Sequence, residues 1–176
     1  MKISNAVIWL SLLIAGLALA AAGIGLLYQI EGRAISFTTV RGVTVQLYGQ
    51  GWYRLDTPIA AVGFMAADLV TLVLAIPLLI VSVLRYRRGS LAGGFLLSGV
   101  LAYFLYNYGS LAFGSTYNNL FLVYVAIFSA SLFALILVLT SFDVPALPAH
   151  FSARLPRRGI SVFLIASGAI LLLVWL

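Results

Sequence analysis

The sequence contains no cysteine, so the chain can form neither a disulfide nor a thiolate metal site and has no thiol nucleophile. Charge is also scarce, because Asp, Glu, Lys and Arg make up 8% of the 176 residues, against about 25% in a soluble domain. Only four residues are acidic, and the sequence has a single histidine. This composition argues against a soluble domain and leaves few side chains for acid–base or metal chemistry.

The few chemically active side chains are spread along the chain. His150 has no second histidine for paired haem ligation, and a zinc site needs three or four His, Cys or carboxylate ligands. Glu31 and Asp56 fall in one predicted loop and Asp143 near the opposite membrane face, so no acid pair for hydrolysis is predicted. We find no glycine-rich phosphate motif and no serine nucleophile elbow. The sequence therefore predicts no catalytic residue, cofactor or metal, and an enzyme is the least favoured class.

Apolar residues dominate, at 64% of the chain, and occur in runs that match the roughly 20 residues needed to cross a bilayer. The sequence predicts an all-α integral membrane protein in which residues 1–176 form a single transmembrane domain, a bundle of five helices. Ala6–Leu27 is longer than the ~7–15-residue core of a signal peptide, so we expect this helix to be retained. The predicted spans cover about residues 6–28, 57–84, 91–113, 120–140 and 159–176, with an external loop at 29–56.

The ten basic residues lie in connections between the predicted spans, which favours a role in membrane orientation over nucleic-acid binding. A cytoplasmic amino terminus places seven of them inside and three outside, in agreement with the positive-inside rule. We therefore expect a multi-pass protein of the cell membrane with a cytoplasmic amino terminus and an extracytoplasmic carboxyl terminus. The inside set is Lys2, Arg85, Arg87, Arg88, Arg154, Arg157 and Arg158, and the outside set is Arg33, Arg41 and Arg54.

The external loop has the pattern of a small β-hairpin. Two β-rich runs, Ile35–Val40 and Val43–Tyr48, flank the two-residue connection Arg41-Gly42. Such a hairpin is marginal alone, so we expect it to rest on the helix ends. The Gly49-Gln50-Gly51 segment favours a turn over a ligand-binding loop. Three aromatic residues are expected at the headgroup level: Tyr48, Trp52 and Tyr53.

Small residues in the first span predict a packing face. Gly16, Ala20 and Gly23 fall on one helical face, where short side chains let another backbone approach. We expect this face to pack inside the bundle.

Asp68 lies near the middle of the second predicted span. It follows Thr57 by eleven residues, which places it about 15 Å into the bilayer at the helical rise. A charge at that depth costs at least ~2.5 to 3.5 kcal/mol on insertion scales, so the carboxyl group must face protein or water. Pro77, further along this span, lacks a backbone N–H, and we expect a kink there.

Counting the helical rise from each predicted membrane edge brings polar residues of several spans to the level of Asp68. In one interpretation, hydroxyl groups satisfy Asp68 and the cluster only fixes helix packing. In the other, the cluster binds a proton, a small cation or a polar ligand, and the sequence leaves both open. The candidate buried polar site consists of Asp68, Thr71, Tyr103, Tyr106, Asn107, Ser129, Ser131 and Ser167, and its external mouth of Asn118 and Asn119.

Three segments carry a resemblance to a known group of proteins: YGQGWYRLD at 48–56, YFLYNYGS at 103–110 and TYNNLFLVYVAIFS at 116–129. With them, the chain resembles a family of prokaryotic multi-span integral membrane proteins over residues 45–142. The resemblance implies a multi-span fold and no defined activity. The order of one helix, an external β-rich loop and three further helices is also similar to claudin-like proteins, although their cysteines are missing here.

Three functions are compatible with these observations. The favoured hypothesis is a non-enzymatic accessory or interaction subunit that lies in the bilayer and contacts a membrane-protein partner or a second copy of itself. The alternative is a small transporter or channel for protons, cations or a polar solute, with a mid-membrane site at Asp68. An intramembrane enzyme acting on lipid is the least favoured, because it needs a second catalytic group beside Asp68.

Overall fold

The computed structural model describes residues 2–28, 30–152 and 155–175. It divides into two compact units, Met1–Phe142 and Asp143–Leu176. Four residues that the sequence predictions include lie outside the described residues. Gln29 begins the predicted loop, Arg154 is one of the predicted inside basic residues, Met1 begins the predicted domain, and Leu176 ends both that domain and the predicted fifth span.

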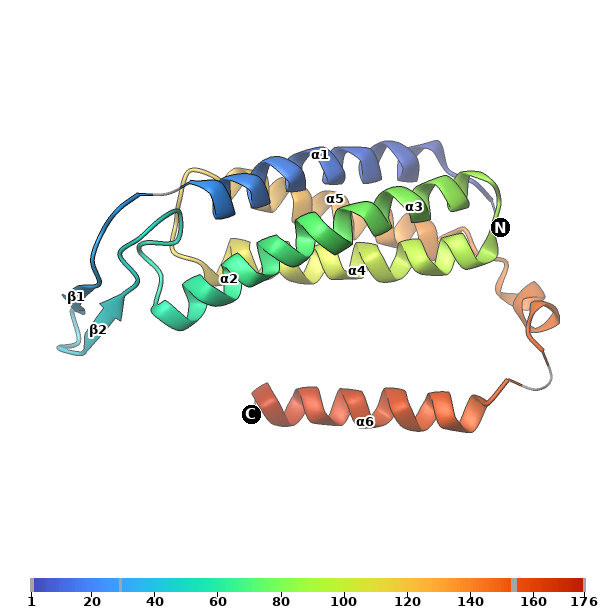
Figure 1. Cartoon of the computed structure of the whole chain (residues 1–176). Helices are drawn as coiled ribbons and strands as arrows, with labels where there is room; N and C mark the ends of the chain where they lie inside the picture. Colours follow the sequence, from blue (N-terminus) through green and yellow to red (C-terminus); the bar gives the residue numbers. More distant parts are fainter. Residues whose placement is uncertain (1, 29, 153–154, 176) are drawn as a thin grey trace. The chain divides into compact units, whose positions relative to one another are not determined.

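The first unit contains four helices that are long and apolar enough to cross a membrane, so by helix length and composition the chain is a multi-pass membrane protein (Figure 1). The second of them is continuous over Pro58–Arg87, although its middle turn departs from α-helical geometry. The helical elements are α1 (Asn5–Leu27), α2 (Pro58–Val70), the π-helical segment η1 (Thr71–Ala75), α3 (Ile76–Arg87), α4 (Leu91–Gly114) and α5 (Phe121–Thr140).

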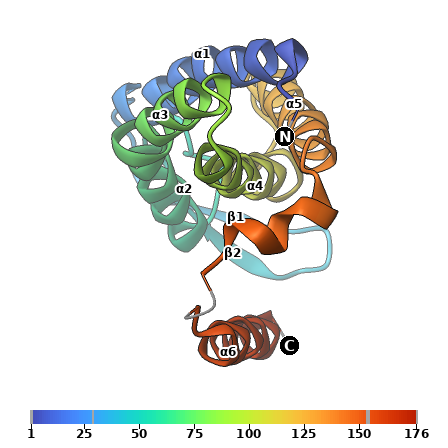
Figure 2. The ribbon, with the colours of Figure 1, turned by 90° about the vertical axis from the view of Figure 1, so that its right-hand side faces the viewer.

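The four long helices close into a ring in which each packs against its neighbours. α5 contacts both α1 and α4, and α3 contacts both α4 and α1, as the end view in Figure 2 shows. Each long helix buries at least one large apolar side chain to 1% exposure or less: Ile14, Leu79, Phe104 and Ile127. Large apolar side chains also cover the outside, so both faces of these helices are apolar, as expected for helices surrounded by lipid.

The small-residue face of α1 differs from the sequence prediction. Gly16 and Gly23 have no neighbouring atom within 4 Å of a Cβ built on them, and Ala20 is exposed, so the prediction was wrong. The helix instead buries a neighbouring face that includes Ala18 and Gly25. Both faces carry small residues at helical spacing, and only the packing partners decide which one turns inward.

A π-helical turn interrupts the second long helix just before Pro77. The N–H of Ile76 donates to the carbonyl of Thr71, five residues earlier. Pro77 has no N–H to offer to the carbonyl of Val73, and its ring crowds that carbonyl. A widened turn accommodates this conflict, so the irregularity expected at Pro77 takes the form of η1.

The loop between α1 and α2 contains the predicted hairpin, formed by β1 (Ile35–Thr38) and β2 (Thr44–Leu47) in antiparallel register. The predicted two-residue connection at Arg41-Gly42 is wrong. The N–H of Thr39 donates to the carbonyl of Val43, and the N–H of Gly42 donates to the carbonyl of Thr39, both at 2.8 Å. Three residues therefore connect Thr39 to Val43. Gly42 has φ of 77°, which only glycine adopts freely.

Glycines also shape the base of the loop. A Cβ on Gly32 would overlap the carbonyl of Gly49, and a Cβ on Gly49 would overlap that of Arg33, so the two sides of the loop cross closely there. The N–H of Gly51 donates to the carbonyl of Ile30 at 3.1 Å. Gly49 and Gly51 have φ of 78° and 61°, consistent with the predicted turn.

The second unit contains the 3₁₀ segment η2 (Val144–His150) and α6 (Arg157–Trp175). No residue of η2 is buried, and the His150 ring lies 3.0 Å from the carbonyl of Ala146. α6 begins two residues before the predicted fifth span at 159–176. Its role as a membrane span stays a prediction, as does the orientation of the chain.

Candidate functional site

Asp68 is held inside the bundle by the external loop. It lies on α2 and is 1% exposed, as is Tyr53 of the loop. The Tyr53 hydroxyl donates to Asp68 Oδ2 at 2.7 Å. Burial and the nearby Asp68 carboxyl group raise the pKa of Tyr53, so its hydroxyl keeps the proton it donates. Tyr53 is therefore not at the headgroup level where the sequence placed it, but reaches down between the helices.

Gly25 on α1 makes room for this contact. A Cβ built on Gly25 would overlap Asp68 Oδ2, and it would lie 3.0 Å from both Asp68 Cγ and the Tyr53 hydroxyl. Any other residue at this position would push the carboxyl group or the tyrosine aside. Three segments far apart in the sequence thus meet at one point.

A second polar group lies one helical turn further along. Thr71 Oγ1 and the Tyr103 hydroxyl are 2.8 Å apart, and the Asn107 side-chain amide donates to Thr71 Oγ1 at 3.4 Å. The Tyr103 hydroxyl also donates to the carbonyl of Ala67 at 3.2 Å. Thr71 begins the π-helical turn, so these contacts join that turn to α4. The structure therefore brings three of the predicted site residues together beside Asp68.

Three other predicted site residues do not join this group, and the place of Ser167 stays a prediction because it belongs to the second unit. Tyr106 is 65% exposed, because about 100° of helical rotation separates it from its buried neighbour Asn107. Ser129 is half-buried. Ser131 is fully buried on α5, and its hydroxyl has no hydrogen-bond partner among the described residues. Ser167 belongs to α6 of the second unit and is half-buried.

The neighbours of Asp68 are tyrosines and not a counter-cation. Four tyrosines lie near it, and the hydroxyl of one, Tyr53, donates to it, whereas no basic side chain among the described residues is a partner. No cluster of three or more metal-ligating side chains occurs among these residues either. The group can fasten the loop and fix helix packing, but it offers no second acid or base for catalysis. The four tyrosines are Tyr53, Tyr103, Tyr108 and Tyr124.

The loop is attached to α5 and to the α4–α5 connection as well. The Trp52 indole N–H donates to the Tyr124 hydroxyl at 3.1 Å. The N–H of Thr116 donates to Asp56 Oδ1 at 2.6 Å, and the Thr116 hydroxyl donates to the carbonyl of Leu55 at 3.0 Å. Burial raises the pKa of Asp56, whereas the hydrogen bonds from Thr116 oppose this shift.

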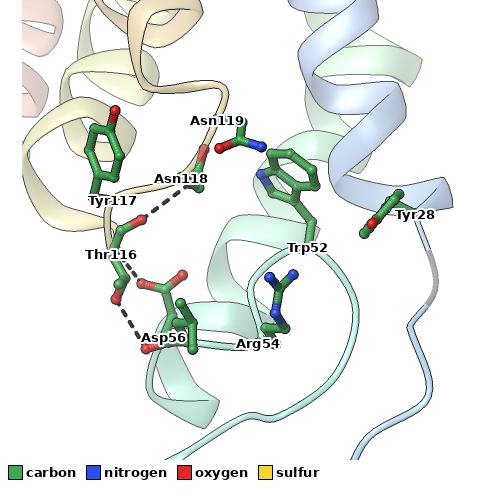
Figure 3. A pocket seen from close by; sticks show the side chains of 9 residues that line it. Tyr28, Trp52, Arg54, Asp56, Thr116, Tyr117, Asn118 and Asn119 are labelled. Atoms are coloured by element: carbon green, nitrogen blue, oxygen red, sulfur yellow. Dashed lines mark hydrogen bonds between the residues drawn. The ribbon is translucent and has the colours of Figure 1, made fainter.

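These contacts border a cavity of about 170 Å³ at the end of the bundle that carries the loop (Figure 3). Asn118 and Asn119, the predicted mouth residues, both belong to its lining. Tyr124, which receives the Trp52 hydrogen bond, also interacts with Tyr53 and Asn118. Polar contacts therefore connect the cavity to Asp68. The lining consists of Tyr28, Trp52, Arg54, Leu55, Asp56, Thr116, Tyr117, Asn118 and Asn119.

The sequence prediction missed Tyr53 and Gly25, which complete the Asp68 contact, and Trp52, Asp56 and Thr116, which close the cavity. Tyr53 and Trp52 are of the residue types that anchor proteins at the membrane surface, and so they were assigned there. No spacing rule relates a loop residue to the helix that it contacts in the fold. Thr116 and Asp56 are separated by 60 residues, so their pairing leaves no local pattern.

Comparison of the chain with models of known protein families, with curated proteins and with solved structures finds no match. The resemblance over residues 45–142 therefore identifies no family, and the function has to be argued from the site itself.

Replacing Gly25 with alanine should destabilise the bundle. The added methyl group overlaps Asp68, and overpacking of this kind costs about 1–3 kcal/mol. We expect a lower melting temperature for Gly25→Ala in detergent. Gly23→Ala, two residues away with no atom within 4 Å of the new Cβ, is the matched control and should melt like the wild type. Equal melting temperatures for the two variants would show that Asp68 is not held against α1.

Removing the Tyr53 hydroxyl should lower the free energy of unfolding by an amount that depends on Asp68. Tyr53→Phe leaves a buried carboxyl group without its donor, which costs about 1–3 kcal/mol of unfolding free energy. The measurement is unfolding in mixed micelles of increasing SDS content. Tyr106→Phe, at a residue 65% exposed, is the control and should have no effect. In an Asp68→Asn background the cost of Tyr53→Phe should change, whereas strict additivity would contradict direct coupling of the two residues.

Proposed function

We propose that this protein is a non-enzymatic accessory subunit of the membrane that presents its external β-hairpin to the extracytoplasmic part of another membrane protein. The observation that carries the proposal is a contrast within the loop. Its base is fastened to the bundle through buried hydrogen bonds, whereas the hairpin it supports leaves an apolar face uncovered.

The fastened base supports the proposal because it gives the hairpin a defined position. Tyr53 attaches the loop to α2, Trp52 attaches it to α5, and Asp56 attaches it to Thr116 after α4. A loop held at three separate places loses little further entropy when a partner binds. Such preorganisation lowers the cost of association.

The hairpin has one polar and one apolar face. On the polar face, the hydroxyls of Thr38 and Thr44 lie 3.2 Å apart, and the Gln46 amide donates to Ser36 at 2.8 Å. The apolar face pairs Ile35 with Leu47 and Phe37 with Val45. Ile35 and Phe37 remain 50% and 54% exposed, and two strands alone make a marginal sheet.

The charges on the hairpin indicate the chemistry of the partner. Arg33, before β1, and Arg41, in the turn, are exposed, and Val40 at the turn is fully exposed. A complementary surface is apolar at its centre and acidic at its rim. The hairpin lies beyond the end of α2, outside the helical bundle (Figure 1), which favours a protein surface over the acyl chains as the occupant.

The alternative of a transporter or channel has less support from this geometry. Asp68 is 1% exposed and does not line the cavity beside Trp52, so a proton or ion would need an opening of the bundle to reach it. An enzyme acting on lipid also has less support, since the neighbours of Asp68 are hydroxyl groups and a glycine. A closed, hydrogen-bonded carboxyl group suits a structural role.

The proposal includes the membrane arrangement. α6 serves as a fifth span, the amino terminus is cytoplasmic and the carboxyl terminus extracytoplasmic. The arginine-rich end of α3 supports this orientation. Arg85 and Arg87 lie in its last turn and Arg88 follows it, and basic residues at the end of a span favour the cytoplasmic side. The hairpin is then outside, where it can meet the exposed parts of other membrane proteins.

Cysteine labelling tests this orientation without background, because the natural chain has no cysteine. In intact cells, a membrane-impermeant maleimide should label Arg41→Cys but not Arg88→Cys or His150→Cys. The two latter variants should react after permeabilisation. A cysteine appended after residue 176 should be labelled from outside if α6 crosses the membrane. The reversed pattern would contradict the orientation, and protection of the appended cysteine in intact cells would contradict the fifth span.

Site-specific photocrosslinking in native membranes tests the docking face. A photoreactive amino acid at Phe37 should give an adduct with one defined extracytoplasmic protein segment, identified by mass spectrometry. The same amino acid at Ser36, on the opposite face of the strand, is the matched control and should give at least tenfold less. An adduct with lipid, an adduct of twice the subunit mass, or no adduct at either position would refute docking to another protein.

A further inference from the structure

We infer that the cavity at the external end of the bundle binds a small zwitterion, with its ammonium group at Asp56 and its phosphate or carboxylate group at Arg54. This inference goes beyond the proposed function, because the occupant is a small molecule and the residues involved lie below the hairpin.

The size of the cavity limits the occupant. Its volume of about 170 Å³ is below the roughly 300 Å³ at which pockets for drug-sized ligands begin. A headgroup or a small metabolite fits this range, whereas a peptide or a nucleotide does not. The lining is mixed, with aromatic rings, amides and two charges of opposite sign.

The cationic end of the ligand is assigned to Asp56. This carboxylate is 6% exposed, although it lies at the surface end of the bundle. Thr116 is the one residue among those described that acts on it, through a hydrogen bond to Oδ1. The carboxylate therefore has no cation of its own, and a buried carboxylate gains from a cationic partner.

Two aromatic rings line the same cavity. Tyr28 and Trp52 meet edge to face, with centroids 5.3 Å apart and planes at 84°. The indole N–H is used by Tyr124, which fixes the orientation of the ring. Aromatic faces attract cationic groups, and the guanidinium group of Arg54 lies towards Trp52 (Figure 3). The rings therefore help to keep Arg54 in the cavity.

The anionic end is assigned to Arg54. Its guanidinium group turns into the cavity towards Trp52, with the Asn119 amide on the other side of the indole (Figure 3). Arg54 and Asp56 line one cavity, and the hydrogen bond to the Asp56 carboxyl group comes from Thr116 and not from Arg54. A guanidinium group binds phosphate or carboxylate through two parallel N–H donors.

Two sources supply this chemistry, namely a phospholipid headgroup and a free solute outside the cell. Tyr28 follows the last residue of α1, so the cavity lies at the end of the helices, next to the expected membrane surface. The same contacts would hold phosphoethanolamine as the headgroup of a lipid or as a free solute. The experiment therefore needs one arm for each source.

Trp52 is itself a reporter for the test. Replacing Trp9 and Trp175 with phenylalanine leaves it as the one tryptophan of this sequence, which has three. In phosphatidylglycerol nanodiscs, we expect phosphoethanolamine to change its fluorescence saturably, and inorganic phosphate or ethanolamine alone to bind at least tenfold more weakly. Nanodiscs that also contain phosphatidylethanolamine distinguish the sources. Competition from the lipid identifies a headgroup site, and an unchanged titration identifies a site for free solute.

Variants assign the two ends of the ligand. Arg54→Gln and Asp56→Asn should each raise the dissociation constant for phosphoethanolamine at least tenfold. Arg33→Gln, in the same loop but outside the lining, is the control and should leave it unchanged. Arg54 is exposed, so its variant should fold normally even if Asp56→Asn weakens the Thr116 contact. Equal binding of inorganic phosphate and phosphoethanolamine, unaltered binding by Arg54→Gln, or no fluorescence change with any probe would overturn the inference.

Discussion

The hydrogen bond from Tyr53 to Asp68 is the contact on which the rest of the structure depends. A carboxyl group inside a helix bundle is costly unless polar groups satisfy it, and this one has hydroxyl neighbours in place of a counter-cation. The contact requires Gly25 on α1, where a side chain would occupy the same space. It also requires the external loop to descend between the helices. One buried acid therefore constrains a helix, a loop and their relative position.

The same constraint organises the polar interior. Thr71 follows Asp68 by three residues and starts the π-helical turn that Pro77 imposes, and there it meets Tyr103 and Asn107 of α4. Polar side chains inside a membrane bundle are expected to satisfy one another in this way. Away from this group, α3 contacts α4 and α1 through apolar residues such as Leu79 and Val83. The bundle thus combines a hydrogen-bonded region with an apolar one.

The external features follow from the way the loop is fastened. Because Tyr53 points into the bundle, its neighbour Trp52 reaches Tyr124 and Asp56 reaches Thr116. These contacts border the small cavity and leave Arg54 facing into it (Figure 3). They also support the hairpin, whose apolar face contributes nothing to the base. A positioned hairpin and a polar cavity are two consequences of one anchored segment, and each suggests a separate partner.

The sequence by itself determined the class of the protein, because apolar runs of membrane-spanning length and a paired β-pattern depend on local composition alone. It also singled out Asp68, since an acid in such a run must be sheltered. Only the tertiary structure decided what shelters it. Helical periodicity groups residues within one element, so it grouped Tyr106 with Asn107 and selected Gly16 and Gly23 over Gly25. The contacts that matter join residues of different elements, and no local pattern records which faces of those elements meet.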